Sequence, residues 1–512
     1  MNRTRKVVYN TITAFLHIIV NQLISLTVSI KVLETYGPDY HGLNSILSNV
    51  MIWFLVLEGG LTTASTVAMY KPFMSKDYDR CNEILSASRI RFNQVGGIIL
   101  FAGLVCAWIY PLFLKTPIAY WETGVIFSIM SFSTAFGIIY TRKFGLMYSV
   151  TQNEYILQFI SIILGIVANL IVLVIALNHA HYILIRGIFL ASTIFTGLVL
   201  SIIIKKKYVF INYHSTPDLN AIKGTKDVVM QKLTGILRSS VPSLYIATFL
   251  GTTWASIYSV NLYGYNFVRN IMVNIYTATQ SGIGQIVAER DNNAVYKVFR
   301  VFEYIGISAL MLMMSTAFVM TIPFVRFYTR NLSGEIPYVN YWLWIIIAVN
   351  VSIQMLHIPS GIIINMNAKF KEDRNFQIAG IVVMLAGMMI LGYFFKLEGI
   401  MLGVTLGSLT LGACEVYYTR SRIFHLGYVD YFKPILIDLA VLIPAIMIEC
   451  KFFPEKVSII EFFIFAAISG ICHILLLVIV NLIFERERFF LFIERIKKIM
   501  NKKMDNRFVK SL

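Results

Sequence analysis

Apolar runs of about 20 residues recur along this whole 512-residue chain, and this repetition limits its possible folds more than any other feature. A bilayer offers no water to pair with the backbone, so a segment that crosses it must be a helix or part of a closed barrel. Hydrophobic residues make up 57% of the chain and charged residues only 14%, whereas soluble domains have about 25% charged residues. The sequence therefore predicts an all-α polytopic membrane protein.

Hydropathy and run length together predict fourteen membrane spans. The weakest are 233–251 and 256–284, because both are polar and interrupted by Gly or Pro. The predicted spans are 9–33, 43–69, 92–114, 121–141, 155–177, 183–204, 233–251, 256–284, 301–325, 341–365, 375–395, 398–419, 434–450 and 460–484.

The placement of basic residues supports this count. With the N-terminus inside, the inner loops and tails hold 34 of the 44 Lys and Arg residues, and the outer loops hold 6. The other four, Lys31, Arg186, Arg238 and Arg269, lie within spans or at their ends. This asymmetry follows the positive-inside rule, so we expect both termini in the cytoplasm. The net charge of +17 then indicates inner loops that face anionic lipids, and no nucleic-acid partner is expected.

The longest internal cytoplasmic loop, 205–232, divides the chain. It separates an N-lobe of six spans, 1–204, from a C-lobe of six spans, 233–420, an arrangement typical of transporters built from repeats. Two extra spans follow within 421–484. The basic tail, 485–512, has the pattern of an interfacial amphipathic helix, and a solvated tail is the alternative.

Several classes of protein are excluded by what the sequence lacks. The five cysteines show no paired spacing, so neither a disulfide framework nor a metal site is predicted. No Walker A pattern is present. The outer loops are too short to carry the acid, base or nucleophile of a membrane enzyme. We therefore expect a protein that is not an enzyme and has no cofactor.

Polar residues at helical spacing break three of the predicted spans, and they suggest a hydrated cavity. The alternative is that these groups form hydrogen bonds between packed helices. The residues assigned to the cavity are Asn21 in the first span, Tyr258, Asn261, Tyr265, Arg269, Asn270 and Tyr276 in the eighth, and Asn350, Gln354 and His357 in the tenth.

Three charged residues complete this set. Glu58 lies halfway along the span 43–69, where a carboxylate costs roughly 2.5–3.5 kcal/mol to insert. It pairs with a cation, stays neutral, or forms a static ion pair with Arg269. Arg269 offers a five-donor fork suited to phosphate oxygens, and Arg238 offers the same at the inner end of its span. His357 is either a satisfied interior histidine or a proton carrier.

Small residues recur every four positions in the span 398–419, at Gly399, Gly403 and Gly407. This pattern predicts a helix that approaches a neighbour closely.

Three stretches carry a resemblance to a known family: "RKVVYNTITAFLHIIVNQLISLTVSIKVLETYGPDYHGLNSILSNV", "VLEGGLTTASTVAMYKPF" and "VPSLYIATFLGTTWASIYSVNLYGYNFV". With the span pattern, the chain resembles the polysaccharide flippases of the multidrug/oligosaccharidyl-lipid/polysaccharide exporter superfamily, in particular the O-antigen and capsule repeat-unit flippases. Glu58–Gly59 matches the family's acidic residue before a glycine, with Glu where Asp is more usual.

The resemblance implies two six-helix lobes around a central cavity that opens alternately to each side of the bacterial cytoplasmic (inner) membrane. It implies an undecaprenyl-pyrophosphate-type lipid-linked oligosaccharide as substrate, moved to the outer leaflet for the synthesis of surface polysaccharide or lipopolysaccharide. Arg269 would then contact the pyrophosphate, and the Asn and Tyr side chains the sugars. Membrane lipids, a polymerase and other glycan-assembly proteins are the implied partners, with proton or sodium coupling open.

Three alternatives remain. Fourteen spans also suit the lipid II flippase branch of the superfamily. A multidrug/cation antiporter would have the same fold, but we would expect an acidic cavity there, and Arg269 favours an anionic head group. A membrane glycan polymerase or ligase is disfavoured by the short outer loops.

Overall fold

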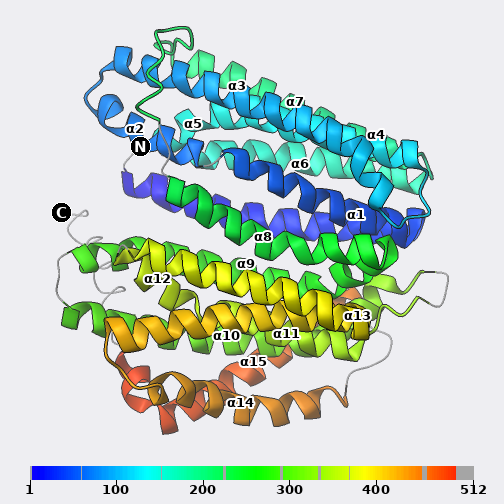
Figure 1. The fold of residues 1–512 in the computed structure, drawn as a ribbon, viewed down its shortest axis with the longest axis vertical. Coiled ribbons are helices and arrows are strands. Elements are labelled where there is room, and N and C mark those ends of the chain that lie inside the picture. Colours follow the sequence, from blue (N-terminus) through cyan, green and yellow to red (C-terminus); the bar gives the residue numbers. More distant parts are fainter. Residues whose placement is uncertain are drawn as a thin grey trace. The chain divides into compact units, whose positions relative to one another are not determined.

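The computed structural model describes residues 3–58, 60–151, 153–222, 226–288, 292–332, 336–367, 369–452 and 458–491, and these residues form helices and no strands (Figure 1). The helices are α1 (Arg3–Phe54), α2 (Leu61–Met74), α3 (Tyr78–Ile109), α4 (Tyr120–Phe136), α5 (Lys143–Val150), α6 (Glu154–Leu177), α7 (Tyr182–Lys207), α8 (Lys226–Phe249), α9 (Thr252–Ala288), α10 (Asn292–Thr329), α11 (Tyr341–Leu356), α12 (Ile358–Met366), α13 (Phe370–Tyr417), α14 (Val429–Glu449) and α15 (Ile459–Phe484).

Every one of the fourteen predicted spans falls on helix, and the prediction of an all-α multi-pass membrane protein is confirmed. Ten helical segments of the described chain are long and apolar enough to cross a membrane. Two predicted pairs of spans are merged within α1 and within α13. The helices α8 and α9 do not reach that hydropathy, as their polar sequences lead one to expect.

Backbone turns divide the two merged helices at the predicted boundaries. In α1 the chain turns at Gly37, whose φ of 83° favours glycine, and Pro38 follows it. In α13 the turn is made by Phe395 and Lys396, the latter with a φ of 48°. Each merged helix is therefore two spans joined by a tight turn.

The predicted span 43–69 is not one continuous helix. A 3₁₀ turn at Leu55–Glu58 and the left-handed Gly60, with φ 81°, separate α1 from α2. The predicted span 341–365 also breaks, at His357 between α11 and α12, where Pro359 lies in the first turn of α12 and has no backbone N–H to donate.

The contacts divide the chain into two units. Unit 1 comprises Met1–Tyr258 with Asn331–Gly334, and unit 2 comprises Ser259–Arg330 with Glu335–Leu512. In unit 1, α1 packs against α6 and α8, and α4 packs against α3 and α7 (Figure 1). In unit 2, α11 packs against α13, and α10 packs against the last two helices, α14 and α15. Of the predicted tail 485–512, residues 486–491 are helical and 492–512 lie outside the described residues.

The glycine repeat of the span 398–419 lies where the two halves of α13 pack against each other. A Cβ atom on Gly403 would lie 2.2 Å from the backbone nitrogen of Met388, and one on Gly407 would lie 2.6 Å from the carbonyl oxygen of Gly380. The predicted close approach is confirmed: the two halves of α13 touch through backbone, which only glycine permits.

We expect Gly403→Ala to destabilise the protein by about 1–3 kcal/mol, because the added methyl group meets backbone that cannot move aside. Thermal unfolding of the detergent-solubilised protein measures this change. Gly187→Ala in α7 is the matched control, since nothing lies within 4 Å of its added Cβ atom. Equal melting temperatures for the two variants would contradict the close contact.

Candidate functional site

A cavity of about 200 Å³ lies within unit 1, between α1, α4 and α7. Its walls combine one charged residue and three hydroxyl groups with apolar side chains. The lining residues are Ser48, Met51, Ile129, Met130, Ser133, Thr134, Arg186 and Phe189.

Arg186, one turn into α7, is the only cation of this lining. Its Nη2 atom donates to Asn44 Oδ1 and to the Tyr182 hydroxyl, the latter at 2.7 Å. The rings of Tyr182 and Phe189 flank the guanidinium at 5.5 and 5.7 Å. The Nε atom is buried and has no hydrogen-bond partner among the described residues. The guanidinium group of Arg186 is therefore held in place, and its Nε–H remains available as a hydrogen-bond donor. Such a group is suited to bind an oxyanion such as phosphate.

Two of the hydroxyl groups beside Arg186 are held by hydrogen bonds, one between helices and one within α1. Ser133 of α4 exchanges a hydrogen bond with Thr193 of α7 at 3.0 Å, and Ser48 donates to Asn44 at 3.5 Å. Asn44 thus contacts both the guanidinium and a hydroxyl of the cavity. One fixed positive charge among neutral hydroxyls is a suitable environment for a phosphorylated, hydroxyl-rich ligand.

Unit 2 contains a buried polar seam between α11 and α13. Asn350 Oδ1 accepts hydrogen bonds from Ser408 at 2.9 Å and from Gln354 at 3.2 Å. About two turns further along, His357 Nδ1 lies 2.8 Å from Glu415 Oε2, and both side chains are buried. The structure therefore brings together three residues predicted from the sequence, Asn350, Gln354 and His357, and pairs them with two that were not.

Asp373 extends this seam. It accepts hydrogen bonds from Gln377 at 2.8 Å and from Asn365 at 3.3 Å, and it lies close to Glu415. Two carboxyl groups and one imidazole, those of Asp373, Glu415 and His357, therefore lie together in the buried part of unit 2. Within the described residues, no group of three His, Cys, Asp or Glu side chains has the geometry of a metal site.

Glu58 lies at a helix break rather than along a continuous span. Its carboxylate accepts hydrogen bonds from the backbone N–H of Thr62, at 3.3 Å, and from the Thr62 hydroxyl. It thus satisfies a donor in the first turn of α2, where a negative charge is favourable. This contact lowers the cost of the carboxylate in the membrane. Its roles toward substrate and toward Arg269 stay predictions.

The other predicted site residues occur in both units. In unit 1, Asn21 pairs with His17 at 2.9 Å and Tyr258 is buried, while Arg238 is half-buried on α8. In unit 2, Asn261 donates to the Tyr338 carbonyl at 2.9 Å, and the Tyr265 hydroxyl to the Trp344 carbonyl at 3.4 Å. Of the rest, Tyr276 is buried against Phe302, Arg269 is half-buried and Asn270 is exposed.

The residues that sequence reasoning missed are Arg186, Ser408, Glu415 and Asp373. Arg186 had a signal, since it is a charge within an apolar span. Glu415 had a similar signal, because it is an acid within the apolar span 398–419. Neither stands in a stripe of polar residues, and the partners Asn44 and His357 are far away in the sequence.

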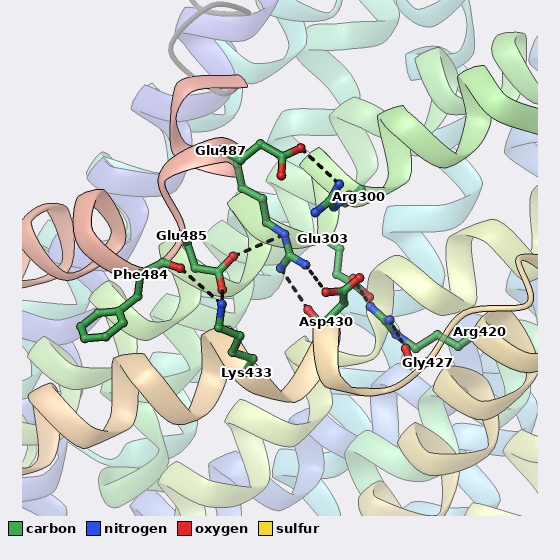
Figure 2. A network of polar contacts seen from close by, with 10 residues as sticks. Arg300, Glu303, Arg420, Gly427, Asp430, Lys433, Phe484, Glu485 and Glu487 are labelled. Carbon is green, nitrogen blue, oxygen red and sulfur yellow. Dashed lines mark hydrogen bonds and ion pairs between the residues drawn. The ribbon is translucent and has the colours of Figure 1, made fainter.

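A second buried cluster in unit 2 joins α10 to the chain around α14 (Figure 2). Glu303 of α10 forms an ion pair with Arg420, and Arg420 also donates to the Gly427 carbonyl at 2.8 Å. Arg488, after α15, pairs with Asp430 at 3.0 Å and with Glu485 at 3.4 Å. These contacts hold the last two helices on α10 and are structural in character.

Solved transporters share this fold. The lipid II flippase MurJ, in an inward closed conformation, aligns with 94% of this chain and 99% of its own, with 14% identity and a TM-score of 0.65. An inward-facing multidrug resistance MATE family transporter of the MOP superfamily aligns with 79% of this chain and 94% of its own, with 13% identity and a TM-score of 0.59. A MOP superfamily transporter from Pyrococcus furiosus aligns with 82% and 95%, with 14% identity and a TM-score of 0.53. No family model and no curated protein matches the sequence. The chain therefore has the fold of MOP superfamily transporters.

We expect Glu303→Leu or Arg420→Met alone to cost about 3–5 kcal/mol, because each leaves an uncompensated buried charge. The double variant should recover most of this loss, since two apolar side chains replace the pair. Chemical unfolding of the purified variants measures the effect. Arg422→Met, an exposed position in the same turn, should change little. The pairing would be contradicted if the double variant lost as much stability as the two single variants together.

Proposed function

We propose that the protein flips an isoprenoid-pyrophosphate-linked oligosaccharide from the inner to the outer leaflet of the bacterial cytoplasmic membrane, for the assembly of surface polysaccharide. The observation that carries the proposal is Arg186, a fixed cation in a hydroxyl-lined cavity of a membrane protein with a transporter fold. Its guanidinium would bind a phosphate group of the substrate, and Ser48, Ser133 and Thr134 would contact the adjacent sugar.

The nature of the Arg186 cavity favours this substrate over a hydrophobic cation. A multidrug antiporter needs an acidic or apolar site for its cargo, whereas this lining contains no acidic residue and one arginine. A lipid II flippase also carries a lipid-linked pyrophosphate sugar, and the wide coverage of MurJ supports a substrate of this chemical class. Arg269 in unit 2 keeps its proposed role toward the pyrophosphate.

The proposal includes proton coupling through the cluster of His357, Glu415 and Asp373. A proton held between neighbouring carboxyl groups would be released when a conformational change moves them apart, which would link protonation to conformation. Tyr431 and Cys414 are further titratable groups near Glu415. The carboxylate of Glu303 pairs with Arg420 instead.

We expect Arg186→Gln to reduce surface polysaccharide at least tenfold and to leave the lipid-linked intermediate inside, because losing a desolvated charge contact costs about 2–5 kcal/mol of binding. Arg186→Lys should recover part of the loss, since it restores the charge but not the fork. The measurement uses a deletion strain that expresses each variant, with surface glycan and lipid-linked glycan quantified separately.

Arg91→Gln is the control for this experiment, because Arg91 is an exposed arginine of the same unit that donates a hydrogen bond to Gln94. Full transport by Arg186→Gln would remove the phosphate role of this residue. A deletion strain with normal surface glycan but with new sensitivity to cationic drugs would favour the antiporter instead.

For coupling, we expect Glu415→Gln to accumulate normally but to lose the dependence of transport on the pH gradient, because an amide keeps the shape and cannot exchange the proton. Transport by proteoliposomes with and without an imposed pH gradient tests this. Glu398→Gln, in the same half of α13, replaces a carboxylate that accepts from Asn340 and should remain coupled. Gradient-dependent transport by Glu415→Gln would assign coupling elsewhere.

A further inference from the structure

Three basic side chains meet at one end of unit 1, apart from the Arg186 cavity. They are Arg89 on α3, Lys143 at the start of α5 and Lys205 in the last turn of α7. Arg89 and Lys205 lie close enough to Lys143 to repel its charge. The charge placement in the sequence assigns this end of the unit to the cytoplasm.

Lys143 is held among aromatic rings. Its Nζ atom lies 4.6 Å from the ring centre of Phe144, 5.1 Å from that of Tyr140 and 6.0 Å from that of Tyr213. The residue follows directly on a π-helical turn, Gly137–Arg142, and such turns are frequent at functional sites. The rings fix the ammonium group in position, but they do not neutralise it.

Arg89 is fixed by the segment 208–222, which folds back onto α3. Asn82 donates to the Phe210 carbonyl at 2.9 Å, and Arg80 pairs with Asp218 at 2.5 Å. Arg89 Nη1 contacts the His214 ring at 3.0 Å, while its Nε atom is buried and has no hydrogen-bond partner in the part of the chain that the structure describes. The segment thus holds the guanidinium in place and leaves one donor unused.

The acidic residues nearby do not compensate this cluster. Glu83 and Asp218 both pair with Arg80, whose guanidinium holds the pKa of Asp218 below its ordinary value. No ion pair joins Arg89, Lys143 or Lys205 to an acid among the described residues. Arg89 and Lys143 are held in place and Lys205 is exposed beside them. Like charges at this spacing repel one another, and an anion bound among them would relieve that repulsion.

The surface beside the cluster indicates where that anion comes from. Leu198 and Ile202 of α7, 51% and 55% exposed, precede Lys205 at helical spacing. They form an apolar stripe that leads to the cation on one face of the helix. A ligand with acyl chains along the stripe and a charged group at its end satisfies both features.

We propose that Arg89, Lys143 and Lys205 form a binding site for the phosphate group of an anionic phospholipid of the inner leaflet. Basic pockets between membrane helices on the cytoplasmic side are suited to such head groups. The site is separate from the proposed substrate cavity, because none of its residues lines that cavity. Bound lipid would hold α3, α5 and α7 together at this end.

Native mass spectrometry of the full chain with phosphatidylglycerol tests this site. We expect Arg89→Gln and Lys143→Gln to retain the lipid about fivefold more weakly, the factor expected for one basic residue at an anionic membrane surface. Lys143→Arg keeps the charge and should retain the lipid. Arg91→Gln is the matched control, two residues along α3 and exposed.

The outcomes separate the alternatives. Equal losses in Arg91→Gln and Arg89→Gln would show general surface attraction and overturn the site. Unchanged retention in both Arg89→Gln and Lys143→Gln would overturn it as well. A second experiment adds inorganic phosphate to the protein in phosphatidylcholine nanodiscs. If phosphate stabilises the protein against thermal unfolding, and if Arg89→Gln and Lys143→Gln lose this effect, the site binds a free anion. Thermal unfolding of each variant without added anion identifies a change that is only structural.

Discussion

The cost of leaving a polar group unpaired in hydrocarbon governs this structure, because water is not available to repair a missing hydrogen bond. The chain meets this constraint in two ways. Some buried polar side chains pair across helices, as Asn350 does with Ser408 and Glu303 with Arg420. Others keep a donor that has no hydrogen-bond partner among the described residues, and the Nε atoms of Arg186 and Arg89 are two of these. The packing of the protein does not use these donors, so they can contribute to binding a ligand.

The same constraint explains why the helices were predictable from the sequence. An apolar run of about 20 residues has one stable solution in a bilayer, so all fourteen predicted spans fall on helix. The breaks were harder to predict, because they depend on local backbone geometry. The turn at Gly37–Pro38 has a clear signature, but the break before α2 depends on the left-handed Gly60 and on Glu58 accepting from Thr62. A hydropathy average treats Glu58 as an anomaly within a span, whereas the structure makes it part of the helix end.

The candidate site was only partly predictable, and the reason is sequence separation. Stripes of polar residues at helical spacing pointed to Asn350, Gln354 and His357, since neighbours on one helix face are visible in the sequence. Their partners Ser408 and Glu415 lie 54 to 58 residues further on, on another helix. Arg186 meets Asn44 across 142 residues. The helical periodicity of a sequence shows only neighbours on the same helix, so it cannot identify such a pair. An isolated charge in a span is best treated as one partner of a contact with a distant part of the sequence.

The distribution of unused groups supports a division of labour between the units. In unit 1 the groups left over are guanidinium and ammonium groups, which suit anions and cannot serve as carriers of an exchangeable proton while they stay charged. In unit 2 the buried cluster of His357, Glu415 and Asp373 consists of carboxyl and imidazole groups, which do not attract a phosphate. The proposed proton-driven flippase must recognise an anionic head group and respond to protonation without letting the two charges neutralise each other. The placement of Arg186 in one unit and of the acids in the other would meet this requirement, because each cluster already contains the partners that hold it in position.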